Sequence, residues 1–376
     1  MKSFLPNNIK DENRKIIFDI VMQHPELAKV EITEKTAMSF VTVSKIVSFF
    51  ESIGLLIATG ESREGSGGLG RKRTVYRFNE NSYAAIGIQT IGKKMTALLV
   101  NLHGNIIDSH SIDTPIPFYS DEFAAAFEEI VARMRNKALE TGTAILGAGI
   151  GVDGAINIRK KMIRIKTQDH QEQDYDYEPI VEQLRNRVNL PILLENDVNA
   201  SILAEFRSLE NAGEAPNDLV LIAAGDGIGA GIILGKELHR GMNASAGELE
   251  YMCFDPEFKK SPSSVGWLES TLGLETLLKT YDLSSERERE ACADFVSRRL
   301  AMVIASIISL LDIHRIVISG KTAALFPEQI LSGTRAYVEQ YTELTPVITV
   351  SDSAYSTAIG AATLILQQEM LRVLSA

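Results

Sequence analysis

A glycine-rich segment, AAGDGIGAGIILG at residues 223–235, has residue types that could do chemistry. Glycine-rich turns between apolar strands often surround a phosphate with backbone N–H groups, because no side chain keeps the backbone away. Asp226 lies in the middle of this turn. Two like charges about 4 Å apart repel each other by on the order of 1 to 4 kcal/mol in water-like to surface-like surroundings. We therefore expect the turn to shape the wall of a cleft without binding a nucleotide phosphate.

The composition is that of a globular protein with two or three domains. The chain has 376 residues, of which 45% are hydrophobic and 23% charged. The longest apolar run, residues 300–311, contains two serines and is shorter than the roughly 18 residues that suggest a membrane span. The first residues lack the apolar segment of a secretion signal, so we expect a cytoplasmic protein without a membrane partner. Cys253 and Cys292 are interpreted as buried thiols.

The net charge of −11 is unevenly divided along the chain. Residues 1–84 contain 12 Lys and Arg against 10 Asp and Glu, whereas the remainder contains 26 against 39. A mildly basic head on an acidic body is compatible with a small DNA-binding module joined to another domain.

The first 56 residues predict three helices, at about 11–22, at 32–37 and directly after Ser39, whose hydroxyl can cap the third helix. A buried stripe follows at helical spacing: Val43, Ile46, Val47 and Phe50. The outer face carries Phe40, Thr42, Ser44, Lys45 and Ser48. Two short helices and a third with a small polar face are typical of a helix-turn-helix, whose last helix enters the major groove. We predict DNA contacts from Ser39, Phe40, Thr42, Ser44 and Lys45.

Residues 55–79 predict a strand, a loop and a returning strand, which together form a wing. Arg71, Lys72 and Arg73 lie at its tip, where they can reach DNA phosphates or a narrow minor groove. Taken alone, this hairpin could be an ordinary solvated loop beside a three-helix bundle. The order of the elements favours a winged helix-turn-helix domain at residues 1–80. We expect Arg71→Ala to weaken binding to all DNA sequences and to flatten its salt dependence.

From residue 84 onward, apolar strands alternate with helices. We predict strands at 84–91, 94–102, 105–113, 145–152, 191–196, 219–224 and 229–235, and helices at 121–138, 178–188 and 198–207. The remainder is mostly helical apart from strands at 315–320 and 347–352. Strands followed by helices, occurring twice, predict an α/β protein with two related halves around a cleft. Ligands of such sheets bind at the carboxyl ends of the strands.

Two segments carry a resemblance to a known family: PILLENDVNASILAEF at 191–206 and GDGIGAGIILGKELHRGMNASAGELEYM at 225–252. They resemble the ROK family, which comprises sugar kinases and sugar-responsive repressors. The resemblance covers residues 84–376, and the repressor branch carries a winged helix-turn-helix ahead of this domain. It implies an actin-like, hexokinase-like (ribonuclease H-like) α/β domain with two lobes, preceded by an α+β DNA-binding domain.

The resemblance also implies the residues of a sugar pocket. In the family's kinases, the aspartate of the END motif takes the proton from the attacking hydroxyl, and this residue is Asp197 here. Asn196 beside it contacts the sugar, and Glu248 and Glu269 accept sugar hydroxyls. Gly154 and Tyr251 complete the expected ligand-binding set; Tyr251 stands where the family has histidine.

The motifs for ATP and zinc depart from the family pattern. Gln89, Ile91 and Lys93 stand in place of the aspartate, a glycine and the threonine of the first phosphate motif, D-x-G-G-T. Asp226 replaces the threonine of the second phosphate loop, and 319–321 replaces a Gly-Gly pair near the adenosine. We predict a degenerate kinase that uses no cofactor and keeps Asp197 as a vestigial base. The family's zinc needs one His and three Cys, and no cysteine stands at 254–270, so we predict no metal.

Three functions remain open at this stage. The first is a transcriptional repressor of carbohydrate genes that binds an operator as a homodimer or dimer of dimers and responds to a sugar or sugar derivative. The second is an ATP-dependent sugar kinase with an appended DNA-binding head. The third is a DNA-binding or architectural protein whose sugar cleft is vestigial.

Overall fold

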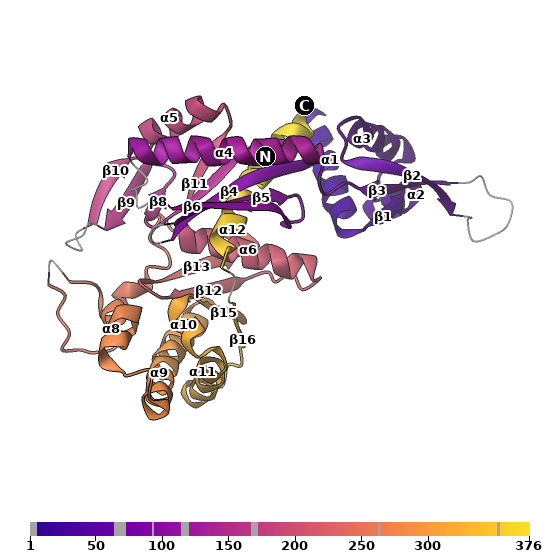
Figure 1. The fold of residues 1–376 in the computed structure, drawn as a ribbon. Coiled ribbons are helices and arrows are strands. Elements are labelled where there is room, and N and C mark those ends of the chain that lie inside the picture. The colour runs from indigo at the N-terminus through magenta and orange to yellow at the C-terminus, as the bar shows by residue number, and fades with distance from the viewer. Residues whose placement is uncertain are drawn as a thin grey trace.

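The computed structural model describes residues 6–63, 73–91, 94–113, 120–166, 172–261, 264–351 and 354–376. A small N-terminal head, two lobes built on five-stranded sheets, and two central helices make up the fold (Figure 1). In the described residues, no helix combines the length and apolar character needed to cross a membrane.

The head contains the predicted helices and both strands of the wing. Its elements are α1 (Pro6–Gln23), β1 (Glu26–Ala28), α2 (Lys29–Thr36), α3 (Phe40–Ser52), β2 (Leu56–Arg63) and β3 (Arg73–Phe78). Ser39 caps α3, since its Oγ accepts the Thr42 N–H at 3.1 Å. The short strand β1, which pairs with β3, was not predicted, because three residues are too few for an alternating pattern. Arg71 and Lys72 lie outside the described residues, as does the side chain of Arg73.

The first lobe is built on the sheet β11-β7-β4-β5-β6. Its strands are β4 (Tyr83–Ile91), β5 (Lys94–Asn101), β6 (Ile106–Asp113), β7 (Ala144–Val152) and β11 (Ile192–Asn196). The helices α4 (Asp121–Thr141) and α5 (Glu178–Val188) share an apolar core with one face of this sheet. A small sheet of β8 (Ala155–Asn157), β9 (Met162–Lys166) and β10 (Glu172–Asp176) extends from it and was not predicted, because its strands are short and partly polar.

The second lobe repeats the strand order of the first. Its sheet is β14-β13-β12-β15-β16, with strands β12 (Leu219–Ala224), β13 (Ile228–Leu234), β14 (Glu237–Leu238), β15 (Arg315–Ser319) and β16 (Val347–Val350). In both sheets, three antiparallel strands are followed by two parallel ones. The prediction of two related halves is therefore confirmed.

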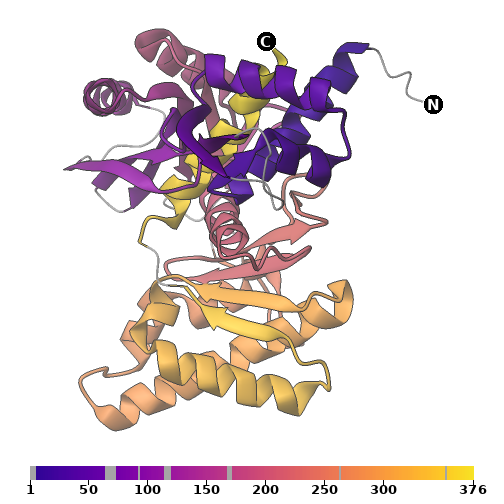
Figure 2. The same cartoon turned by 90° about the vertical axis from the view of Figure 1, so that its right-hand side faces the viewer.

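Helices cover the outer face of the second sheet (Figure 2). They are the short η1 (Leu249–Tyr251), α7 (Trp267–Leu272), α8 (Leu274–Thr280), α9 (Glu286–Leu311), α10 (Lys321–Leu325) and α11 (Pro327–Tyr341). Apolar side chains of α9 form the centre of this core, among them Cys292, which is buried as expected. The same expectation was wrong for Cys253, which is exposed because it lies in an irregular segment after η1.

Two helices, α6 (Asp197–Asn211) and α12 (Ser356–Ser375), lie between the two sheets. The apolar side of α6 packs on the second sheet, whereas α12 packs on the first. The helices meet backbone to backbone, since a Cβ added at Gly360 would lie 1.6 Å from the Ala200 carbonyl oxygen. Only glycine allows this approach, so the backbones of α6 and α12 are in direct contact at this point.

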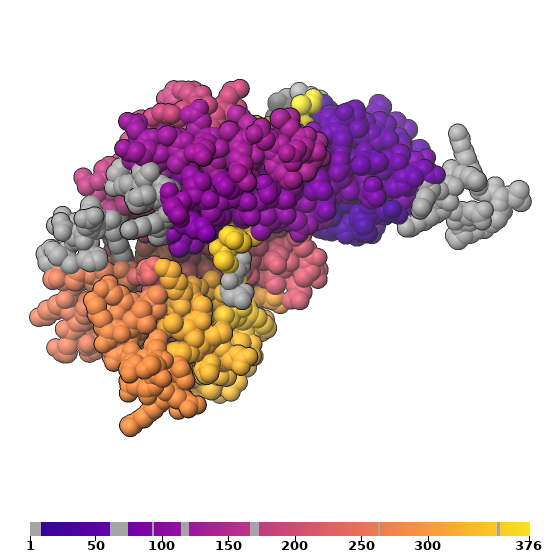
Figure 3. Space-filling view, viewed as in Figure 1, coloured from indigo at the N-terminus to yellow at the C-terminus, as the bar shows by residue number. Residues whose placement is uncertain are grey.

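The head and the first lobe share one apolar core. Met370 and Leu374 of α12 are buried with Ile17 and Val21 of α1, in the same cluster as strands β4 and β5. Figure 3 shows the head and first lobe as one continuous body, with the second lobe attached below it. The C-terminal end of α12 is thus part of the surface on which the head is docked.

Candidate ligand cleft and DNA-facing helix

Asn196 and Asp197 lie where the parallel strand β11 passes into α6, which is the edge where ligands of α/β sheets bind. Asn196 is the N-cap of α6, and its Oδ1 accepts the N–H groups of Val198 and Asn199, each at 3.0 Å. Its Nδ2 donates to the Gly154 carbonyl at 3.1 Å and so ties α6 to the turn after β7. The cap and this bond fix Asn196 beside the cleft.

Asp197 is the first residue of α6 and is partly buried. Burial raises its pKa to about 7, and the nearby carboxylates of Asp153 and Glu248 act in the same direction. Hydrogen bonds from the backbone of the helix start oppose this rise without cancelling it. A carboxyl group that titrates near neutrality can both accept and donate a hydrogen bond to a sugar hydroxyl.

Asp153 was not predicted as part of the site. It follows directly after β7 and is exposed. The signal was present in the sequence, because a carboxylate that follows a buried parallel strand lies at the ligand-binding edge of the sheet. Asp153, Asp197 and Glu248 give this part of the cleft an acidic, hydrogen-bond-accepting character.

The second lobe supplies the other predicted residues of the pocket. Glu248 immediately precedes η1, Tyr251 is its last residue and is 47% exposed, and Glu269 lies in the first turn of α7. Glu269 stands beside the glycine turn 225–227, since its Oε2 would be 3.5 Å from a Cβ added at Gly227. The structure therefore places Glu248 near enough to Asp197 to raise its pKa. Glu269 lies beside the glycine turn, and Tyr251 lies at the end of η1.

A buried ion pair joins the two lobes beside the cleft and was missed by sequence reasoning. Glu195 on β11 is fully buried, and its Oε2 accepts from Nε of Arg240 at 2.9 Å. Its Oε1 accepts from Nδ2 of Asn199 at 3.1 Å and from the Asn196 N–H at 3.0 Å. Removing one partner of such a pair costs about 3 to 5 kcal/mol, because it leaves a buried charge uncompensated. The pair therefore holds the loop 240–247 of the second lobe against the first lobe.

The residues at the expected nucleotide motifs make contacts within the protein. Gln89 is buried, donates from Nε2 to the Ala354 carbonyl at 2.8 Å, and accepts the Ala358 N–H at 3.1 Å. It therefore anchors the start of α12. Asp226 in the glycine turn forms an ion pair with Lys321, at the start of α10. The part of the chain that the structure describes contains no group of three or more His, Cys, Asp or Glu side chains placed to hold a metal ion.

The predicted DNA-facing residues lie together on the first turns of α3. Phe40 and Lys45 are exposed, and Thr42 and Ser44 are partly exposed. Ser39 and Thr42 also contact each other through their hydroxyls at 2.9 Å. Val41 was not predicted to face DNA, yet its side chain is 63% exposed. The stripe itself is buried as predicted, so the outer face of α3 is available to a partner.

A continuous set of contacts links Asp197 to α3 through α12. The Asp197 carbonyl accepts from Ser201 Oγ at 2.8 Å and from Thr357 Oγ1 at 3.3 Å, which joins the first turns of α6 and α12. At the other end of α12, the Leu374 carbonyl accepts from Nη1 of Arg14 at 2.6 Å. The Arg14 guanidinium also lies 3.6 Å from the centre of the Phe49 ring, on α3.

Comparison with known proteins agrees with this architecture. A xylose repressor from Lactiplantibacillus pentosus is 24% identical over 383 residues, covering 97% of this chain and 95% of that protein. A glucokinase from Streptomyces coelicolor is 30% identical over 174 residues, which cover 46% of this chain and 50% of the enzyme. The crystal structure of a ROK family transcriptional regulator, a homologue of the E. coli MLC protein, superposes with a TM-score of 0.73 at 18% identity and covers 98% of this chain and 99% of that one. The model of the ROK family matches residues 85–368, and the chain belongs to this family.

Proposed function

We propose that this protein is a transcriptional repressor whose affinity for an operator responds to a sugar bound between the two lobes. The observation that carries the proposal is the chain of contacts from Asp197 through α12 and Arg14 to Phe49 on α3. A kinase needs no such connection between its catalytic base and a helix that faces outward from an N-terminal head. The likeness to a full-length xylose repressor supports the same function.

The sugar acts on the head through α12. A ligand that bridges Asp197 on the first lobe and Glu248 on the second favours one angle between the lobes over another. Because α6 and α12 are in direct backbone contact at Gly360, a change of this angle shifts α12 and the head docked on it. By reciprocity, operator binding alters the affinity for the sugar by the same factor.

We infer that the nucleotide half of the ancestral kinase site is not used. Lys321 and Asp226 pair with each other at the glycine turn, and their mutual contact places a carboxylate where a phosphate would have to bind. Gln89, which replaces the first motif's aspartate, has its amide committed to Ala354 and Ala358. The protein is therefore a sensor without ATP-dependent activity.

We further propose that residues 1–80 are the DNA-binding unit, that 84–376 are the sensing unit, and that the protein works as a homodimer. Two heads related by a two-fold axis match two operator half-sites about one helical turn apart, or a multiple of that distance. A small rotation of the heads changes this spacing and weakens binding without altering any base contact. Asn196, Asp197, Glu248, Tyr251, Glu269 and Gly154 form the proposed sugar pocket.

Selection of bound duplexes from a random DNA pool tests the proposal. The full chain should enrich a palindromic sequence, and repeating the selection with a panel of sugars should identify one that changes the yield. Ser44→Ala should alter the selected sequence, because residues near the start of this helix contact base edges. Glu51→Ala, at the far end of the same exposed face, is the matched control and should leave the sequence unchanged. Failure to enrich any sequence would contradict the proposal.

A sugar kinase is the second candidate, favoured by one observation. A base with a pKa near 7 is well suited to take a proton from a sugar hydroxyl, and the pKa of Asp197 is about 7. Coupled measurement of ATP consumption over a panel of hexoses separates the two functions. Steady turnover that disappears in Asp197→Asn would favour the kinase over the repressor.

A further inference from the structure

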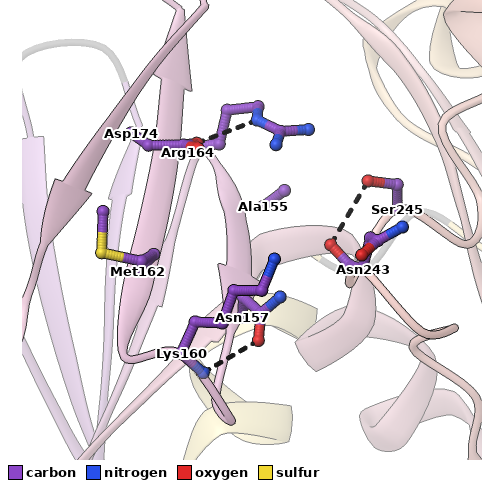
Figure 4. Close-up of a pocket in the computed structure, with 8 residues that line it drawn as sticks. All are labelled: Ala155, Asn157, Lys160, Met162, Arg164, Asp174, Asn243 and Ser245. Carbon is purple, nitrogen blue, oxygen red and sulfur yellow. Dashed lines mark hydrogen bonds and ion pairs between the residues drawn. The ribbon is translucent and has the colours of Figure 1, made fainter.

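The helix α6 runs from the space between the lobes to the junction with the head. At its start, its N-cap residue donates to the Gly154 carbonyl, and the next residue, Ala155, lines a cavity of about 230 Å³ with walls from both lobes (Figure 4). At its other end, Nδ2 of Asn211 donates to the His103 carbonyl at 2.6 Å, in the turn 102–105 between β5 and β6. The end of α6 that is away from the cavity therefore contacts this turn.

Contacts on two sides hold the turn 102–105. From α6, Nη2 of Arg207 donates to the Leu102 carbonyl at 3.4 Å. From the segment that links the head to β4, the Glu80 carbonyl accepts the Leu102 N–H at 3.1 Å. The His103 ring lies against Phe78 of β3, with 5.4 Å between the ring centroids and 72° between the ring planes. His103 therefore lies where α6, the first lobe and the head meet.

The His103 ring has apolar surroundings. Its neighbour Phe78 is buried and also packs in a T-shaped contact against Phe18 of α1, with 6.0 Å between the centroids. The imidazole is half-buried, and within the described part of the chain neither of its nitrogens forms a hydrogen bond. A charge on this ring has no partner in these contacts to replace the water that the junction excludes.

Two charged residues face the imidazole. Glu80 comes from the linking segment and Arg207 from α6, where Arg207 also pairs with Glu210 at 3.2 Å. Burial lowers the pKa of His103 below its usual value; the Glu80 carboxylate opposes this change, and the Arg207 guanidinium adds to it. The docked head therefore favours the neutral imidazole.

We propose that His103 is a positioning residue for the head, and that its neutral form alone holds the head in the observed orientation. A proton on this ring places a second cation beside Arg207 in a half-buried, apolar junction, so proton uptake favours opening of the contact with Phe78. The proposed sugar signal reaches α1 through α12, whereas the proton acts at β3. Acidification is thus an input to the head that is separate from the sugar.

The direction of the pH effect follows from proton linkage. When the head leaves the junction, the pKa of the ring returns to the ordinary imidazole value of about 6.5, which is above its value in the docked head. Opening therefore takes up a proton, and docking weakens as the pH falls below about 6.5. For one such group, the equilibrium constant for opening changes by at most about tenfold per pH unit.

Hydrogen exchange of the full chain, without DNA or sugar, measures the docking of the head. Protection factors of the β3 and α1 amides, corrected for the intrinsic pH dependence of exchange, are compared between about pH 7.5 and about pH 5.5. We expect the protection of wild type to fall relative to that of His103→Phe, which keeps a ring against Phe78 but takes up no proton. Asp197 titrates in the same range, but it is present in both proteins, so the difference between them isolates His103.

Two further variants sharpen the test. His103→Lys carries a permanent cation and should lower the protection of β3 at both pH values. His314→Gln is the matched control, because His314 is exposed and lies before β15 in the second lobe; it should keep the wild-type response. An equal pH response in wild type and His103→Phe would overturn the inference, as would wild-type protection in His103→Lys at about pH 7.5.

A measurement on wild type alone covers the case in which the variants do not fold. In protein labelled at its histidines, the ring resonance of His103 should titrate below the ordinary value of about 6.5. Titration at or above that value would overturn the inference.

Operator binding separates this inference from the proposed function, on which its consequence for DNA rests. Without sugar, acidification should weaken operator binding more in wild type than in His103→Phe. A pH response of β3 protection in a protein that binds no operator contradicts the proposed function and supports the role of His103. Operator binding with the same pH dependence in both proteins contradicts the role of His103 and supports the proposed function.

Discussion

Arg14 is the residue whose replacement most directly tests how the two ends of the molecule communicate. It is 7% exposed, and it joins the last turn of α12 to α3 by its bond to the Leu374 carbonyl and its stacking on Phe49. Arg14→Met keeps an apolar chain of similar length and removes the guanidinium. The substitution therefore leaves the packing of α1 largely in place while it breaks the polar link.

The magnitude follows from the two contacts. A hydrogen bond from a charged donor is worth about 1.5 to 3 kcal/mol. A cation–π contact adds about 0.5 to 2 kcal/mol, with the larger value for a desolvated pair such as this one. Coupling between two binding sites is typically about 1 to 3 kcal/mol, which is a change in affinity of roughly 5- to 150-fold. The link through Arg14 is therefore strong enough to carry the whole coupling.

Fluorescence anisotropy with the selected operator measures the effect. We expect the ratio of operator affinities with and without the effector to fall to within about twofold of one in Arg14→Met, because the coupling free energy is lost. Lys15→Met is the matched control. Lys15 is exposed and forms only an i,i+4 pair with Asp19, which is worth about 0.3 to 0.5 kcal/mol. In Lys15→Met, the ratio of operator affinities with and without the effector should stay at the wild-type value.

Hydrogen exchange of the α3 amides shows whether the head of the variant is still folded. An unchanged affinity ratio in a folded Arg14→Met protein would refute transmission through Arg14. Such a result would leave the apolar contacts of Met370 and Leu374 with α1 as the remaining route.

Three further predictions concern other parts of the molecule. The folded state keeps the proton of Asp197 up to a pKa of about 7, so this residue's contribution to the free energy of unfolding should be lost as pH rises from about 4 through 7, by up to about 4 kcal/mol. Urea denaturation of wild type and Asp197→Asn at pH 5 and pH 8 checks this prediction. A difference in unfolding free energy between the two proteins that is the same at both pH values would contradict it. Gly360→Ala should destabilise the protein by about 3 kcal/mol or more, since its Cβ would meet the Ala200 carbonyl, whereas Gly333→Ala, whose Cβ would meet a side-chain hydroxyl, should cost less in the same assay. The exposed methyls of Val41 can contact a thymine methyl, so replacing operator thymines by uracil should weaken wild-type binding by about 1 kcal/mol at one position and leave Val41→Ala unaffected there; equal losses in both proteins would exclude that contact.

Much of the fold could be predicted because its signals are local. The stripe on α3 and the Ser39 cap depend on residues within a few positions of each other, and both are present in the structure. Eight of the ten strands in the two five-stranded sheets have five to nine residues, most of these are apolar, and most were predicted within a few positions. The small sheet β8–β10 was missed, since strands such as EQDYD carry no hydrophobic alternation and form only against their neighbours.

The candidate site was only partly predictable, because some of its features depend on contacts between segments that are distant in the sequence. The resemblance of residues 191–206 to the END motif of the ROK family pointed to Asn196 and Asp197, and the structure places both directly after β11, at the edge of the first sheet where ligands of α/β sheets bind. The raised pKa of Asp197 depends first on its burial and then on the carboxylates of Asp153 and Glu248, which come from separate segments and meet only in the folded chain.

The sequence by itself determined that a three-helix head with a β-hairpin precedes a two-lobed α/β domain, because helix periodicity, apolar strands and motif spacing are properties of short segments. The tertiary structure decided how these parts act on each other. The pairs Arg14 with Leu374, Glu195 with Arg240 and Asp226 with Lys321 each join residues tens to hundreds of positions apart. Their partners are chosen by the packing of helices and sheets, and no local pattern records that choice.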